Sequence, residues 1–194
     1  GLQFKCDVPV GLDLDAVGEI CRRRGYLLVV DAVQGLGPFS VDVKRSGIHA
    51  LAAGGHQWLL GPEGCGILFV DRDLIPEVEP VEFGWSNVEG WQSHRCDPAP
   101  RPGASRYECD TLNTLGCRGL QAAIDLFLEI GVEAIEQRLH LLAARIAAGV
   151  RSRGYKLMTP REDHHGSGLV SFRKPGVDSE SAVAALAEKG IVAA

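Results

Sequence analysis

Apolar and polar residues follow one another along the chain in a pattern that predicts alternating helices and strands. A first helix is predicted by apolar residues at helical spacing, namely Leu14, Val17, Ile20 and Cys21. Three arginines close this segment, where cations are favourable, and Gly25 is suited to end the helix. The continuous apolar run Tyr26–Val30 then predicts a strand buried on both faces of a parallel sheet.

The remaining elements are predicted in the same way. Short apolar segments bounded by turn residues predict strands at Leu51–Ala53, Cys65–Val70, Tyr155–Met158 and Gly168–Arg173. Apolar residues at helical spacing predict a helix that ends at Gly131 and two more over Ile135–Val150 and Ser179–Lys189. Gly190–Val192 looks like the start of a further strand. Because helices and strands alternate, the pattern favours an α/β fold.

Residues 84–112 interrupt this alternation. They include Trp85, Trp91, His94 and three prolines, and they predict a long irregular segment. Loops of that length inside a compact domain are usually functional.

The composition excludes several classes of protein. The chain has 194 residues, a formal net charge of −5 and 45% hydrophobic residues, which is typical of a globular protein with one or two cores. Its apolar runs are far too short to span a bilayer. Its one basic cluster, Arg22–Arg24, is too small to predict binding to nucleic acid or to an anionic membrane.

The cysteines and the start of the chain carry two further expectations. The six cysteines include no C-x-x-C pair, and several lie in apolar segments, so we expect free thiols in a reducing, cytoplasmic compartment. The chain opens in a strand-like stretch with neither a methionine nor a signal peptide, so we expect a part of the protein to precede it. Residues 163–165 are not expected to hold a metal, because three adjacent side chains rarely converge on one ion.

Asp31 is the first candidate functional residue. It follows a predicted buried strand, and ligands of open α/β sheets bind at the carboxyl ends of the strands. A carboxylate there can hold a protonated ring nitrogen, and Gln34 can offer its amide to a neighbouring oxygen. The alternative is that Asp31 caps a turn and Gln34 is solvated.

A second candidate stretch runs over residues 52–66 and reads AAGGHQWLLGPEGCG. It does not match the G-x-G-x-x-G pattern that opens a helix, so a dinucleotide site is not supported. Its small residues allow the backbone to approach a ligand closely. A lone His56 in such a place is more often structural than catalytic.

Together the two stretches resemble the class V aminotransferases, a family that includes cysteine desulfurases and isopenicillin-N-epimerase-like proteins. The resemblance rests on the order D-A-x-Q-x-x-G followed by A-x-G-G-H-x-W-L-x-G-P-x-G-x-G. Further matches lie at residues 84–86, 106–108, 111–113 and 168–173, so the likeness covers essentially the whole chain. It implies a fold-type-I architecture, with a mainly parallel sheet, flanking helices and a partial C-terminal α/β domain.

The resemblance also implies roles for individual residues around pyridoxal 5'-phosphate (PLP). Asp31 would pair with the pyridinium nitrogen, Gln34 with the phenolic oxygen, and His56 would lie by the ring and phosphate. Thr111 would reach the cofactor phosphate, commonly from the partner subunit of a homodimer. Glu108 and Asn113 would shape the loop that presents Thr111. Trp85 would line the substrate entrance, and the alternative for it is a buried packing role.

The chain departs from the family at the catalytic position. Gln57 stands where the family has its Schiff-base lysine, and a neutral amide can neither form an imine nor act as the base. Gly54 stands where many relatives have a phosphate-binding serine. Asp110 replaces the usual glycine before Thr111, which places a carboxylate near a phosphate.

The resemblance therefore implies a PLP-dependent enzyme acting on an amino acid or amine, with this chain inactive as written. Desulfurase, lyase, epimerase and transaminase are not separated by these residues. One alternative is a pseudoenzyme that binds PLP noncovalently or has lost it, and another is a nonfunctional fragment. Residues 1–131 would belong to the large PLP-binding domain, and residues 132–194 to a connector helix and an incomplete small domain.

Overall fold

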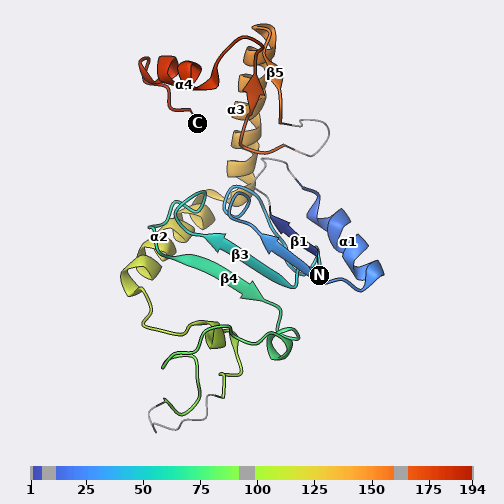
Figure 1. The fold of residues 1–194 in the computed structure, drawn as a ribbon, viewed down its shortest axis with the longest axis vertical. Coiled ribbons are helices and arrows are strands. Elements are labelled where there is room, and N and C mark those ends of the chain that lie inside the picture. The colour runs from blue at the N-terminus through green and yellow to red at the C-terminus, as the bar shows by residue number, and fades with distance from the viewer. Residues whose placement is uncertain (1, 6–11, 92–98, 160–165, 194) are drawn as a thin grey trace. The chain divides into compact units, whose positions relative to one another are not determined.

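The computed structural model describes residues 2–5, 12–91, 99–159 and 166–193 (Figure 1). It contains two compact units, one built mainly from residues 13–135 and the other mainly from residues 136–193. Among these described residues, no helix is both long enough and apolar enough to cross a membrane.

The first unit is organised around a four-stranded sheet in the order β1 (Leu2–Lys5), β2 (Leu28–Asp31), β3 (Ala50–Gly54) and β4 (Gly66–Val70) (Figure 1). β1, β2 and β3 are mutually parallel, whereas β4 runs antiparallel to β3. The sheet is mixed: its first three strands are parallel, as expected, and the β3–β4 pair is antiparallel. The reason is the short connection between β3 and β4, because a parallel pair needs a crossover of a dozen or more residues.

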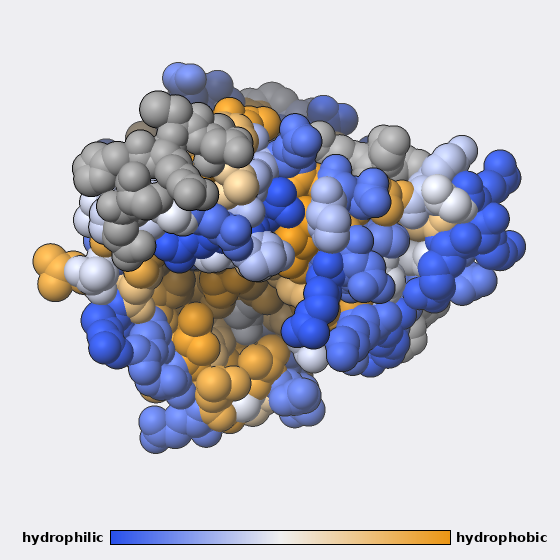
Figure 2. All heavy atoms as spheres, turned by 90° about the horizontal axis from the view of Figure 1, so that it is seen from below, coloured by the Kyte–Doolittle hydropathy of each residue, from blue (hydrophilic) through white to orange (hydrophobic). Residues whose placement is uncertain are grey.

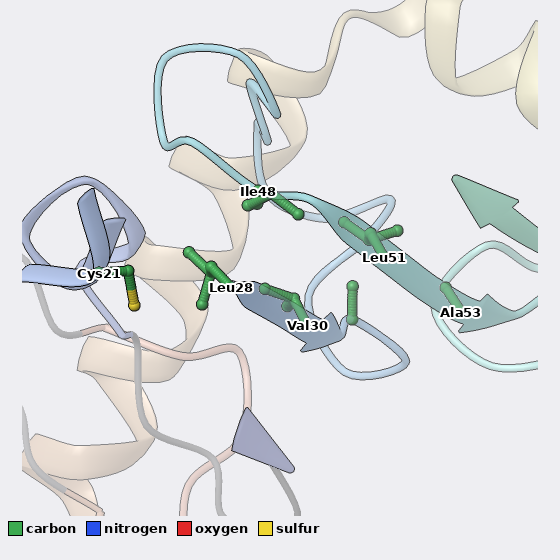
Figure 3. Close-up of a cluster of buried hydrophobic side chains, with 7 residues drawn as sticks. Cys21, Leu28, Val30, Ile48, Leu51 and Ala53 are labelled. Atoms are coloured by element: carbon green, nitrogen blue, oxygen red, sulfur yellow. The ribbon is translucent and has the colours of Figure 1, made fainter. Parts of the chain in front are cut away.

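The core lies on one face of this sheet, where helix α1 (Leu14–Arg24) packs (Figure 3). Its buried residues are Cys21, Leu28, Val30, Ala32, Ile48, Leu51 and Ala53. The helix forms as predicted: Asp13 accepts a hydrogen bond from the Ala16 amide at 2.9 Å, and Gly25 ends it at a φ of 65°.

The other face of the sheet is open. Val29 is 37% exposed and Leu68 is 52% exposed, so the expected burial of the Tyr26–Val30 strand on both faces is wrong for this chain. Within the described residues this face borders a cleft rather than a packed helix. Figure 2 shows hydrophobic residues gathered around a hollow on the face that it presents.

The irregular segment expected over residues 84–112 is confirmed for its described residues, with only the short helix η3 (Ala104–Tyr107) inside it and η1 (Ile75–Glu77) before it. Asn87 is fully buried and holds the segment together. Its Oδ1 accepts a hydrogen bond from the Gly84 amide, and its Nδ2 donates to the carbonyl oxygens of Glu82 and Arg106.

Two long helices follow, α2 (Thr114–Ile130) and α3 (Val132–Ser152), as the apolar spacing predicts. The second unit adds β5 (Lys156–Leu157), β6 (Phe172–Arg173) and α4 (Ser179–Ala187). β5 and β6 are antiparallel and shorter than the predicted strands. Residues 191–193 form no strand, because no described segment pairs with their backbone. The 163–165 stretch lies outside the described residues.

Candidate active site

Asp31 is the last residue of β2 and lies at the carboxyl edge of the parallel strands. The adjacent Ala32 amide donates to the Ala52 carbonyl at 2.7 Å, which extends the β2–β3 pairing past the carboxylate. Asp31 Oδ1 accepts a hydrogen bond from the Val33 amide at 3.1 Å. This half-buried carboxylate therefore caps its own turn and still stands at the edge where ligands of α/β sheets bind.

A cleft of about 650 Å³ opens beside Asp31. It is lined by residues of β2, β3 and β4 and, on the other side, by Ala104, Tyr107 and Glu108 at η3. Its volume falls in the range of small-molecule sites, and its walls are largely apolar apart from the carboxylates of Asp31 and Glu108. Gln34, His56, Gln57 and Thr111 are not among its lining residues.

Gln34 and Gln57, which are 23 positions apart, meet directly. Gln34 Nε2 donates to Gln57 Oε1 at 2.7 Å, and Trp58 Nε1 donates to Gln34 Oε1 at 2.8 Å. The Gln34 amide thus bridges its two neighbours and takes a defined orientation. The Gln57 side chain is therefore held by Gln34, the side chain that the resemblance assigns to the phenolic oxygen.

His56 belongs to the same loop, between β3 and β4. A Cβ placed on Gly54 would lie 3.3 Å from His56 Cε1 and 3.6 Å from Val33 Cγ2, so the imidazole lies against the Gly54 backbone. The base of the loop is closed by the Gly55 amide, which donates to the Cys65 carbonyl at 2.8 Å. A Cβ on Gly55 would lie 2.8 Å from that carbonyl oxygen, so the loop needs glycine there.

Thr111 is hydrogen-bonded to its neighbour Asp110. Its amide donates to Asp110 Oδ1 at 2.6 Å, and Trp85 Nε1 donates to the same oxygen at 3.0 Å. These contacts, the Thr111 amide first, hold the pKa of the Asp110 carboxyl below its usual range. No contact recorded among the described residues joins Thr111 to Asp31, Gln34 or Gln57.

Sequence reasoning missed Trp58 as a partner of Gln34. The sequence places Trp58 next to Gln57. The hydrogen bond from its indole to Gln34, however, depends on how the loop folds back over the residues after β2. It also missed Asn87, whose burial organises the irregular segment.

The residues present fit only part of the cofactor that the resemblance implies. The Asp31 carboxylate beside a cleft fits a protonated ring nitrogen. The Gln57 amide does not fit covalent attachment, because it offers no amine nucleophile. The amide and hydroxyl of Thr111 already contact a carboxylate at Asp110, which does not fit a phosphate on the same donors.

Comparisons with known proteins show which proteins this chain is similar to. The solved apo structure of a cysteine desulfurase from Thermococcus onnurineus NA1 superposes with a TM-score of 0.89 at 29% identity, over 98% of this chain and 47% of that one. A probable cysteine desulfurase of Pyrococcus abyssi is 29% identical over 93% of this chain and 44% of its own length. The chain thus spans about half the length of these relatives.

A second similar structure is a mutant of the protein C-DES with glycine covalently linked to its PLP cofactor. It is 26% identical with a TM-score of 0.82, over 93% of this chain and 48% of that one. The sequence itself matches the family described as Aminotransferase class-V over residues 10–194. The chain therefore belongs to the class V aminotransferase family, whose members use PLP.

Proposed function

We propose that this chain is part of a PLP site that handles an amino acid or amine, and that Gln57 leaves it inactive as it stands. PLP, when bound, supplies an electron sink for the carbon next to the substrate nitrogen. The observation that carries the proposal is the placement of Asp31 at the strand edge, beside the cleft. Residues 1–131 would belong to the large domain and residues 132–194 to the connector and small domain.

Different residues of this chain would bind different parts of the cofactor. Asp31 would hold the ring nitrogen in its protonated form, because an opposite charge nearby favours the cation. Gln34 would offer its amide to the phenolic oxygen, and His56 would lie by the ring. Gln57 supplies neither an amine nor a base, so proton transfer at the substrate carbon has no group at this position.

The complete protein would be a homodimer in the cytoplasm. The family resemblance supports this part of the proposal, because in the family the threonine at the Thr111 position commonly reaches the cofactor of the partner subunit. The six cysteines include no C-x-x-C pair, which supports a reducing compartment.

A second candidate function is noncovalent binding of PLP by a pseudoenzyme. The hydrogen bond between Gln34 Nε2 and Gln57 Oε1 favours it, because Gln57 is built into the polar network rather than left without a partner. The two candidates agree on the ligand and differ in whether a lysine at position 57 restores covalent chemistry.

One experiment separates them. The chain and its Gln57→Lys variant are titrated with PLP, reduced with borohydride and digested, and the modified residue is identified by mass spectrometry. Gln57→Arg is the matched control, because it adds the charge without a nucleophilic amine. An adduct at position 57 is expected in Gln57→Lys alone.

Three outcomes of this experiment bear on the proposal. Saturable PLP binding by the unaltered chain and by Gln57→Lys, without an adduct in either after reduction, supports the noncovalent candidate. Absence of both binding and adduct in Gln57→Lys would overturn the assignment of this site to PLP. An adduct on another lysine of the unaltered chain would overturn the role given to position 57.

A further inference from the structure

Cys65 and Cys117 lie side by side although 52 positions separate them, with their Sγ atoms 3.9 Å apart. Cys65 immediately precedes β4, and Cys117 lies in the first turn of α2. Both side chains are partly exposed, and both are free thiols. A disulfide bond is about 2.05 Å long, so its formation requires the two sulfurs to approach each other from this starting distance.

The surroundings of the pair already join the same two elements. Asn113, which caps α2, donates from Nδ2 to the Gly64 carbonyl at 3.2 Å. The Cys65 carbonyl accepts the Gly55 amide and so closes the loop that carries His56 and Gln57. A covalent bond at this point would therefore tie the loop base to the start of the helix.

The other described cysteines lack this arrangement. Cys21 is 1% exposed in the core, and the Cys109 thiol contacts Glu82 Oε2 at 3.6 Å. Burial and the neighbouring Cys65 raise the pKa of the Cys117 thiol. Proximity to a second thiol is what distinguishes Cys65 and Cys117.

We propose that Cys65 and Cys117 form a reversible intramolecular disulfide by exchange with a low-molecular-weight disulfide. The thiolate of one cysteine attacks a sulfur of the small disulfide and releases one small thiol. The second cysteine then attacks the protein sulfur of the mixed disulfide and releases the other small thiol. The two protein thiols lose two electrons and two protons, and the small disulfide gains them.

This bond is a redox clamp on the candidate site. It fixes the connection between β3 and β4 against α2 without touching Asp31 or Gln34. The proposal does not depend on whether PLP binds, because its geometry involves only the two thiols and the backbone around them.

The test uses the unaltered chain in glutathione buffers of stepped ratio, quenched by alkylation and analysed by mass spectrometry of a non-reduced digest. The same series is run in concentrated urea. A cross-link between Cys65 and Cys117 is expected in the folded chain at a ratio of oxidised to reduced glutathione about tenfold or more below that needed in urea. An equal ratio, or no cross-link, would overturn the proposal.

Two variants complete the test. Cys117→Ser is expected to stop at a mixed disulfide of Cys65 with glutathione, whereas Cys109→Ser should form the cross-link like the unaltered chain. A Cys65 mixed disulfide that persists in the unaltered chain would also overturn the proposal, because Cys117 would then fail to displace glutathione. So would a preferred cross-link of Cys65 to any other cysteine.

Discussion

Gln34 donates a hydrogen bond to Gln57 over 2.7 Å, which joins the turn after β2 to the loop after β3. The contact links two residues to which the resemblance assigns positions near the cofactor. The same Gln34 side chain accepts the Trp58 indole, so both of its polar ends are used. The Gln57 amide is thus part of an ordered polar cluster.

The pair should behave as an energetically coupled unit. In a double-mutant cycle of Gln34→Ala and Gln57→Ala, we expect a coupling of about 0.5–1 kcal/mol, because one hydrogen bond is lost only once. Chemical denaturation measures the free energy of unfolding of each variant. Gln34→Ala combined with Gln121→Ala is the control and should be additive, since the Gln121 side chain contacts Arg118 instead.

Gly84 is required by the close approach of the segment that carries Cys109. A Cβ on Gly84 would lie 1.7 Å from the Cys109 carbonyl oxygen, so Gly84→Ala must push the two segments apart. We expect a loss of about 1–3 kcal/mol in the free energy of unfolding. Gly103→Ala is the matched control, because it meets nothing within 4 Å and its φ is −104°. Equal stability of the two variants would contradict the prediction.

Asp110 should give the irregular segment a defined pH dependence. Its pKa is lowered by hydrogen bonds from the Thr111 amide and the Trp85 indole. Stabilisation is therefore fully present above the unfolded-state value of about 3.9 and is lost as the pH falls through the lower folded-state value. Unfolding measured from pH 7 downwards should show Asp110→Asn less stable at neutral pH and converging with the unaltered chain in acid. A gap that widens in acid would contradict this.

Asn113 serves two partners at once, and its variants should separate them. Its Oδ1 caps α2 by accepting the Gly116 amide at 3.0 Å, while its Nδ2 donates to the Gly64 carbonyl. Asn113→Ala should lose both and cost about 1–2 kcal/mol in the free energy of unfolding. Asn113→Asp keeps the cap and should cost less by the same denaturation measurement. Equal losses would show that the cap contributes little.

The first helix, α1, could be predicted from local sequence signals alone. Apolar spacing, a capping aspartate and a terminal glycine predict α1, and the structure forms it from Leu14 to Arg24. These signals act within a few residues of one another, so they need no knowledge of the rest of the chain. The position of Asp31 at a strand end was predicted for the same reason.

The mixed sheet and the site contacts needed more than local signals. An apolar run predicts a strand but carries no direction, and β4 is antiparallel because the chain turns back within a short loop. The β3–β4 register places Gly66 opposite Gly54, and it brings Cys65 to the base of the loop that holds Gln57. The spacing of apolar residues predicts neither the direction of β4 nor its register with β3.

The residue types and their order along the chain were enough to indicate the α/β pattern and the family, because each of these depends on signals within single segments of the sequence. Packing alone decided that Gln34 would bond to Gln57, that Thr111 would be held by Asp110, and that Cys65 would meet Cys117. The Gln34–Gln57 and Cys65–Cys117 contacts join positions 23 and 52 residues apart. Such pairs form only when strand register and helix placement have brought distant backbone together, and side-chain torsions then settle which atoms touch.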